Sequence, residues 1–148
     1  MDKLRIGTLV SGDQAVDVIP QILPYGFESF SLTFWQKTSH VDLEELAKKV
    51  NEILAEKDAT ISCLSYFGNP LTNTGDNSES LESWEKLIDK AHLFNTNLVT
   101  GFTGRIPDKP IDASIPKFKE VFGDLTKRAE DNNVKIAFEN CDMGGDWE

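Results

Sequence analysis

Several features that would point to particular classes of protein are scarce in this 148-residue sequence. Cysteine occurs only at Cys63 and Cys141, which is too little for a disulfide framework, and the spacing of the two matches no zinc motif. No apolar run approaches the roughly 20 residues needed to cross a bilayer. The N-terminus lacks the apolar stretch and the small-residue cleavage site of a signal peptide. We therefore expect a cytoplasmic protein that does not contact a membrane.

Basic residues are also few compared with acidic ones. The chain has 15 Lys and Arg against 25 Asp and Glu, which gives a formal net charge of -10. Such a surface repels a phosphate backbone, so we expect no nucleic-acid partner. The apolar fraction of 39% is that of a globular protein, and the length suits one ordinary domain with a real core.

The sequence alternates between strand-like and helix-like segments. The strand candidates are short, rich in β-branched and apolar residues and bounded by Gly, Asn or Pro: Leu4–Val10, Phe27–Trp35, Thr60–Phe67, Leu98–Thr103 and Val134–Asn140. The helix candidates between them carry an apolar stripe at helical spacing: Asp13–Leu23, Val41–Lys57, Ser80–Asn95 and Ser114–Asn132. Asp42 is placed to cap the second helix, and Pro20 interrupts the first. This alternation predicts βαβ units and a parallel sheet.

Two architectures fit such a pattern, a parallel (β/α) barrel of the TIM type and a doubly wound open sheet. The segment LVSGDQAV after the first strand has one glycine where a dinucleotide fold needs three, which weakens the nucleotide-binding version. In Phe27–Trp35, three apolar residues alternate with Ser29, Ser31, Thr33 and Trp35, so one face is much more polar than the other. A doubly wound sheet buries both faces, so this asymmetry favours the barrel.

A complete barrel has eight strand–helix units, and the predicted elements of this chain correspond to about five of them. The final residues, DMGGDWE, open a loop with no helix to follow. We therefore expect residues 1–148 to be the N-terminal part of a single, truncated TIM-barrel domain.

In both architectures the functional residues follow the carboxyl ends of the strands. Glu139 stands on the more polar face of the last strand candidate, followed by Asn140. A carboxylate there needs a partner, because burying one alone is unfavourable by several kcal/mol. That partner is a divalent cation, a basic residue such as Lys135 or Arg105, or solvent.

The other strand ends offer further candidates, each with a simpler structural explanation. Trp35 is either a wall for a sugar ring or a core tryptophan. Arg105 either binds a phosphate or carboxylate or is a solvated loop residue. Tyr66 ends the third strand, and Asn69 begins an Asn-Pro turn from which it could face a substrate. His40 and His92 lie away from the strand ends and are expected to be exposed and structural, respectively.

Three segments, YFGNPL (Tyr66–Leu71), GFTGRIPDKPIDASIPKFKEVFGDL (Gly101–Leu125) and IAFENCDMGGDWE (Ile136–Glu148), resemble the sugar phosphate isomerase/epimerase family. That family belongs to the xylose-isomerase-like TIM barrels, together with hydroxypyruvate isomerase, tagatose epimerase, inosose dehydratase and endonuclease IV. The resemblance spans the whole chain but only five of the family's eight strands.

The resemblance implies a (β/α)₈ barrel with a divalent metal, Mn, Mg, Zn or Co, at its carboxyl mouth. The ligands are typically a Glu, an Asp, a His and a second Glu, of which only the first maps here, onto Glu139. This residue would also be the acid/base group. The other ligands would lie beyond Glu148, so we do not expect the 148-residue chain alone to hold the metal tightly. The sugar or sugar phosphate would be bound by the strand-end residues Trp35, Tyr66, Asn69, Arg105 and Asn140.

The function implied is isomerisation or epimerisation of a sugar by proton abstraction next to a carbonyl, through a metal-stabilised enediolate. Two alternatives stay open. One is a sugar-binding or self-associating half-barrel without activity, which would form a homo-oligomer. The other is a lyase or an endonuclease-IV-like hydrolase on the same fold.

Overall fold

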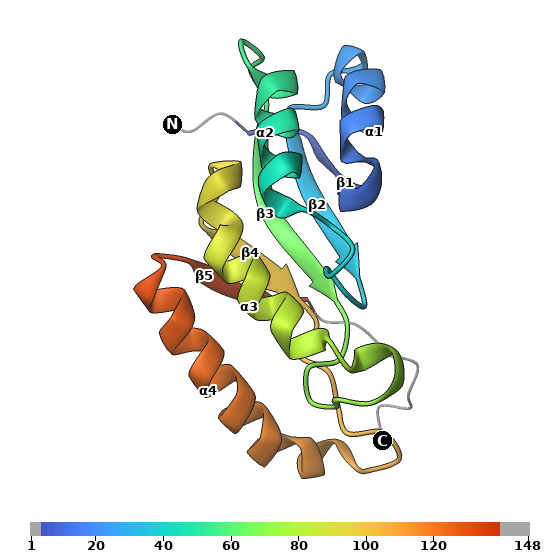
Figure 1. The fold of residues 1–148 in the computed structure, drawn as a ribbon, viewed down its shortest axis with the longest axis vertical. Helices are drawn as coiled ribbons and strands as arrows, with labels where there is room; N and C mark the ends of the chain where they lie inside the picture. The colour runs from blue at the N-terminus through green and yellow to red at the C-terminus, as the bar shows by residue number, and fades with distance from the viewer. Residues whose placement is uncertain (1–3, 140–148) are drawn as a thin grey trace.

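The computed structural model describes residues 4–139, which form one parallel sheet with helices packed against it (Figure 1). The sheet has five strands in the order of the chain, each hydrogen-bonded to the next. They are β1 (Gly7–Ser11), β2 (Ser29–Trp35), β3 (Thr60–Phe67), β4 (Leu98–Gly101) and β5 (Lys135–Phe138). All five strands therefore end at the same edge of the sheet.

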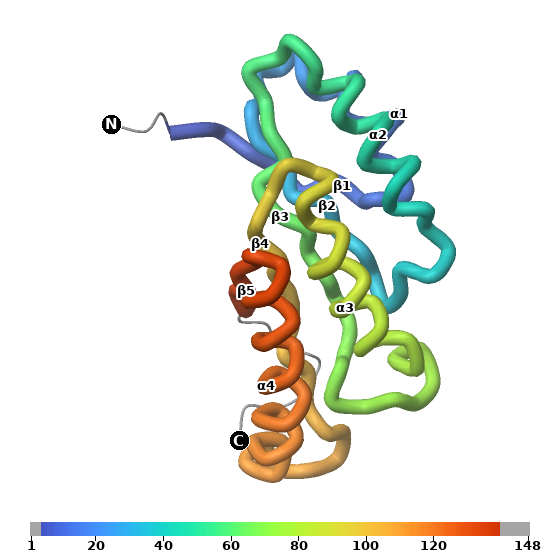
Figure 2. The backbone as a smooth tube through the Cα atoms, turned by 60° about the vertical axis from the view of Figure 1, so that its left-hand side comes forward, coloured from blue at the N-terminus to red at the C-terminus, as the bar shows by residue number. Residues whose placement is uncertain are grey.

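The helices are α1 (Ala15–Ile22), α2 (Leu43–Leu54), α3 (Ser80–Lys90) and α4 (Ile115–Asp131). All four lie on one face of the sheet, as the two views in Figures 1 and 2 show. A doubly wound sheet has helices on both faces and a strand order that reverses, so the structure confirms the expected fold, an incomplete (β/α) barrel of about five units. Within residues 4–139, no helix has the length and apolar character to span a membrane.

The local sequence explains two of these helices. Asp42 caps α2 as expected, accepting hydrogen bonds of 3.1 Å from the backbone N–H groups of Glu44 and Glu45. Helix α1 continues through Pro20 although proline removes a helix hydrogen bond. Ala15 and Ile19 are both fully buried in the core, and this tertiary packing outweighs the weak local propensity.

The hydrophobic core lies between the sheet and the helices. In β2 the alternation expected from the sequence is confirmed, because Phe30, Leu32 and Phe34 are buried on the helix side, with at most 3% of their surface exposed. The side chains between them point to the opposite face, which no helix of residues 4–139 covers (Figure 2). We call this the open face; in a closed barrel it would be the interior.

Strand β3 contains one extra residue relative to β2. Phe30 pairs with Ile61 but Ser31 pairs with Cys63, so Ser62 is a β-bulge. Beyond the bulge, Leu64 and Tyr66 are fully buried on the helix side. Cys63, Ser65 and Phe67 consequently lie on the open face.

Candidate functional site

The carboxyl ends of the strands bring together residues that are far apart in the sequence. Trp35 pairs with Phe67 in the sheet register. The ladder continues one residue past β4 and β5, because Phe102 N–H donates to Tyr66 O (3.2 Å) and Glu139 N–H donates to Gly101 O (2.9 Å). Trp35, Phe67, Phe102 and Glu139 are therefore neighbours along the same edge of the open face.

Three of these residues form a continuous line of rings, here called the aromatic row: Trp35, Phe67 and Phe102. The Trp35 and Phe67 rings meet edge to face with centroids 5.7 Å apart, and Phe67 stacks on Phe102 at 4.7 Å. None of the three belongs to the core cluster between sheet and helices, but Phe102 is itself buried, with 8% of its surface exposed. Trp35 is 66% exposed, so the row presents an apolar surface at the carboxyl edge of the sheet.

Directly beneath the aromatic row, the open face is lined by small hydroxyl and thiol side chains. Ser31 Oγ lies 2.6 Å from Ser65 Oγ, and Ser65 Oγ lies 2.6 Å from Thr100 Oγ1. The Cys63 thiol donates to Ser31 Oγ at 3.2 Å. Barrel interiors are usually filled by large branched residues, so this floor leaves more room than most.

Glu139 closes the line of neighbours at the β5 end. The preceding residue, Phe138, packs against Phe118 and Phe122 of α4, with ring centroids 5.6 and 4.9 Å apart. Because side chains alternate along a strand, Glu139 belongs to the open face, as expected from the sequence. Its side chain is exposed, and no ion pair joins it to Lys135 or Arg105 within residues 4–139.

Tyr66 occupies a different place from the one its position at a strand end suggested. Its ring is fully buried on the helix side, edge-on to Trp84 of α3 with centroids 6.0 Å apart. The phenol oxygen lies 2.8 Å from Ser80 Oγ and donates to the carbonyl oxygen of Gln36 at 2.5 Å. Burial raises the pKa of this phenol above its ordinary value, the nearby Glu79 carboxylate adds to the shift, and the serine hydroxyls partly oppose it. In this geometry Tyr66 is not open to a sugar.

Asn69 and Arg105 join the two loops that follow β3 and β4. Asn69 is buried, with only 7% of its surface exposed. Its side-chain amide donates to the carbonyl oxygen of Arg105 at 2.6 Å, and its side-chain oxygen accepts from Leu71 N–H at 3.2 Å. Arg105 is half-buried as a residue, and its guanidinium donates to the carbonyl oxygen of Lys109 at 2.9 Å in an exposed hydrogen bond. Asn69 therefore shapes the rim, whereas binding of a phosphate or carboxylate by Arg105 stays a prediction. Asn140 lies outside the described residues.

The two histidines lie apart from the aromatic row. His40 is exposed, as expected, and its Nε2 lies 3.0 Å from an oxygen of Asp13. His92 is also exposed, in the short turn after α3. Within residues 4–139, no cluster of three or more His, Cys, Asp or Glu side chains is arranged to hold a metal ion.

Comparison with protein families gives the decisive match. Residues 21–147 match the sequence model of the xylose isomerase-like TIM barrel family. The chain belongs to this family. Among curated protein sequences, no match to the chain was found.

Solved structures of low sequence identity share the fold of this chain. An L-ribulose 3-epimerase superposes with a TM-score of 0.66 at 12% identity, over 92% of this chain and 49% of that one. A 3-keto-D-glucoside 4-epimerase from E. coli gives 0.65 at 14% identity, over 92% and 56% of the two chains. A D-allulose 3-epimerase from Methylomonas sp. in complex with D-allulose gives 0.63 at 14%, over 93% and 51%. The chain spans about half the length of these proteins, with coverage from 49% to 56%.

Sequence reasoning missed Phe67 and Phe102. Both are aromatic residues at strand ends, and only the pairing register between neighbouring strands identifies them as neighbours of Trp35. Phe67 lies opposite Trp35, and Phe102 lies opposite Phe67 once β4 is paired with β3. A single strand does not reveal its register, so the row becomes visible only when the sheet is assembled.

Proposed function

We propose that this chain forms half of a sugar or sugar-phosphate isomerase or epimerase, and that its site lies at the carboxyl edge of the open face. The observation that carries the proposal is the placement of one carboxylate, Glu139, at the end of the aromatic row. A reactive group beside an apolar wall is the arrangement that a small, largely C–H-covered substrate requires.

The aromatic row suits a sugar as ligand. An aromatic ring has a negative face, which attracts the slightly positive C–H bonds on one side of a sugar. Trp35 offers such a surface because it is 66% exposed, and Phe67 and Phe102 support it from beneath the rim. The hydroxyl groups of Ser31, Ser65 and Thr100 continue the same face towards the floor, where sugar hydroxyls would find polar neighbours.

Glu139 would act as the base. Its carboxylate would remove the proton from the carbon next to the substrate carbonyl, so that the C–H bond breaks, an O–H bond forms on Glu139 and an enediolate is left. Returning a proton to the neighbouring carbon gives an isomer, and returning one to the opposite side of the same carbon gives an epimer. The exposure of Glu139 leaves the carboxylate free to reach a ligand on the row.

A divalent metal belongs to the proposal for the complete protein only. A metal of the Mg²⁺ type prefers about six oxygen ligands in octahedral geometry. Glu139 is the carboxylate placed at the aromatic row, and within residues 4–139 no cluster of three ligating side chains includes it, so these residues do not make a metal site by themselves. Further ligands would come from strands outside these residues. A bound metal would supply positive charge for the enediolate oxygen.

The names of the solved structures with this fold agree with a ketose as substrate class. They include an L-ribulose 3-epimerase and a D-allulose 3-epimerase in complex with D-allulose. Those proteins are about twice as long as this chain, so the reaction is proposed for a protein that completes the barrel.

A second candidate is sugar binding without catalysis. The lack of a metal-ligating cluster around Glu139 within residues 4–139 favours it, because isomerisation needs a group that stabilises the enediolate as well as a base. A non-catalytic half-barrel of this kind should also self-associate. In residues 4–139, β1 and β5 are the edge strands of the sheet, and each has one edge with no partner strand. The lyase and endonuclease-IV-like alternatives have no comparable support, and the net charge of -10 opposes a DNA substrate.

Hydrogen exchange in deuterated water tests the proposal. The full-length protein, with its barrel complete, is incubated with D-allulose and Mn²⁺; proton NMR follows loss of the signal next to the carbonyl, and saturation-transfer NMR detects binding. We expect exchange with the unmodified full-length protein and none with its Glu139→Gln variant, whereas Glu52→Gln, on the exposed side of α2, serves as the matched control. Binding without exchange supports the second candidate. Exchange that survives Glu139→Gln rules out the role given to this carboxylate.

A further inference from the structure

The backbone makes a strained turn immediately after Trp35. Gln36 has φ +62°, and Lys37 N–H donates to Trp35 O at 2.8 Å, which closes a three-residue γ-turn. The positive-φ form of this turn is rare and strained for a residue other than glycine. Something in the surrounding structure must therefore hold Gln36 in place.

Two contacts hold it. The Gln36 N–H donates to Phe67 O at 2.9 Å, and the Gln36 carbonyl oxygen accepts from the Tyr66 phenol at 2.5 Å. Both come from the end of β3, one from the backbone and one from a side chain. The Tyr66 phenol therefore fixes the carbonyl side of Gln36, and the backbone of Phe67 fixes its N–H side.

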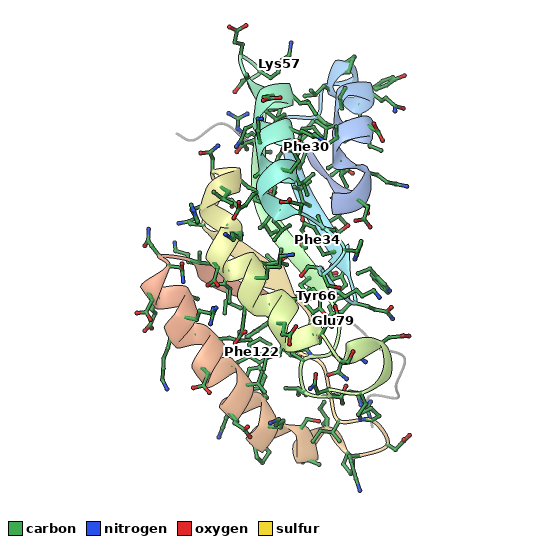
Figure 3. The ribbon with its side chains drawn as sticks, in the orientation of Figure 1. Phe30, Phe34, Lys57, Tyr66, Glu79 and Phe122 are labelled. Atoms are coloured by element: carbon green, nitrogen blue, oxygen red, sulfur yellow. The ribbon has the colours of Figure 1, made fainter. Side chains whose placement is uncertain are left out.

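The phenol is itself fixed. Its oxygen lies 2.8 Å from Ser80 Oγ at the start of α3, and its ring packs edge-on against Trp84. A Cβ at Gly68 would lie only 2.2 Å from the phenol oxygen, so the chain passes closely over it. Figure 3 shows Tyr66 behind the first turns of α3, next to Glu79. The contact to Gln36 is therefore rigidly placed by the core.

The remainder of the β2–α2 loop is held separately. Ser83 Oγ accepts from Thr38 N–H at 3.0 Å, and Lys86 Nζ donates to the carbonyl oxygens of Thr38 and Val41 at 3.0 and 2.8 Å. These bonds would keep the loop in place without Tyr66. Loss of the phenol would therefore release the turn at Gln36 but not the loop as a whole.

We propose that Tyr66 is a positioning residue, which sets the orientation of Trp35 in the ligand site by holding the Gln36 turn through its hydroxyl group. Trp35 touches few neighbours because it is 66% exposed, so its direction depends on its backbone more than on packing. The effect on a ligand rests on the proposed function, whereas the effect on Trp35 does not.

Fluorine NMR of the chain labelled with fluorotryptophan tests this. The Trp35 signal is assigned by its absence in Trp35→Phe. In Tyr66→Phe we expect this signal to shift or broaden, and the affinity for D-allulose to fall about two- to tenfold, the range set by the entropy of ordering one side chain. Lys86→Met is the matched control, because it also removes side-chain bonds to the same loop, those to the carbonyl oxygens of Thr38 and Val41, and it should leave the Trp35 signal unchanged. Ser80→Ala, which keeps the phenol but removes its neighbour, should give a smaller shift and is decisive if Tyr66→Phe does not fold.

The proposal is overturned if the Trp35 signal is unchanged in Tyr66→Phe, or if Lys86→Met moves it equally. If the unmodified chain does not bind D-allulose but the signal shifts as expected, the proposed function fails and the positioning role stands. If D-allulose binds with equal affinity to Tyr66→Phe although the signal has shifted, Trp35 is not oriented for this ligand and the proposal is wrong on that point.

Discussion

Replacement of Gly104 by alanine should destabilise the rim of the site through two separable effects. Gly104 has φ +74°, a conformation that L-residues adopt unfavourably. A Cβ at this position would also lie 2.0 Å from Asn69 Oδ1. Asn69 cannot simply move aside, because its side chain bonds both Leu71 N–H and Arg105 O.

The magnitude follows from these contacts. The left-handed backbone should cost about 1–2 kcal/mol. Displacing the amide of Asn69 weakens two hydrogen bonds, each with a net contribution of about 0.5–1.5 kcal/mol. Gly104→Ala should therefore lower the free energy of unfolding by about 2–5 kcal/mol.

A double-mutant cycle separates the two effects. In an Asn69→Ala background the clashing oxygen is gone, so Gly104→Ala should cost only the backbone part, about 1–2 kcal/mol. Gly26→Ala is the control for backbone strain alone, since Gly26 has φ +88° and nothing within 4 Å of the added Cβ. Gly123→Ala, on an open side of α4, should instead stabilise the chain by about 0.5–1 kcal/mol. Urea unfolding followed by circular dichroism measures the two single variants of the cycle, their double variant and the two glycine controls. Equal costs of Gly104→Ala with and without the Asn69 side chain would refute the clash.

Three further outcomes follow from the described contacts. Asp42→Ala should lower the free energy of unfolding by about 1 kcal/mol in urea titrations through loss of the α2 cap, whereas Asp42→Asn should change it little. The raised pKa of Tyr66 means that the unfolded chain loses this proton first, so stability should fall as the pH rises past about 10, by up to about 1.4 kcal/mol per pH unit, and less so in Tyr66→Phe. Arg128→Met removes the two-bond contact with Asp89 between α4 and α3 (2.8 and 2.7 Å). Because the pair is partly exposed, that change should cost only about 0.5–1 kcal/mol in thermal unfolding, and less at high salt; a loss independent of salt would contradict it.

The order of elements and the faces of the strands could be predicted from the sequence. The short apolar segments between amphipathic helices correctly predict the strands. The alternation of Phe30, Leu32 and Phe34 with small polar residues correctly predicts which face of β2 packs against the helices. The same reasoning placed Glu139 opposite Phe138. Element ends were less accurate, as the strand expected over Leu4–Val10 covers Gly7–Ser11.

The site was harder to predict because it depends on relations between strands. Tyr66 and Phe67 are adjacent strand-end aromatics, but one is buried beneath α3 and the other belongs to the aromatic row. Nothing in the local sequence distinguishes them, because the bulge in β3 decides which faces the helices. Asn69 likewise looks like a turn residue, and its bond to Arg105 O joins loops that are 36 positions apart in the chain.

The bulge at Ser62 also bears on how insertions and deletions in this chain would act. Loss of that single residue would remove the bulge without changing the faces, because Ile61 would still pair with Phe30 and the next residue, Cys63, with Ser31, so Leu64 and Tyr66 would stay in the core. Loss of one paired residue beyond the bulge, such as Leu64, would instead exchange the inside and the outside of the rest of the strand, so a deletion in β3 is tolerable only at the bulge.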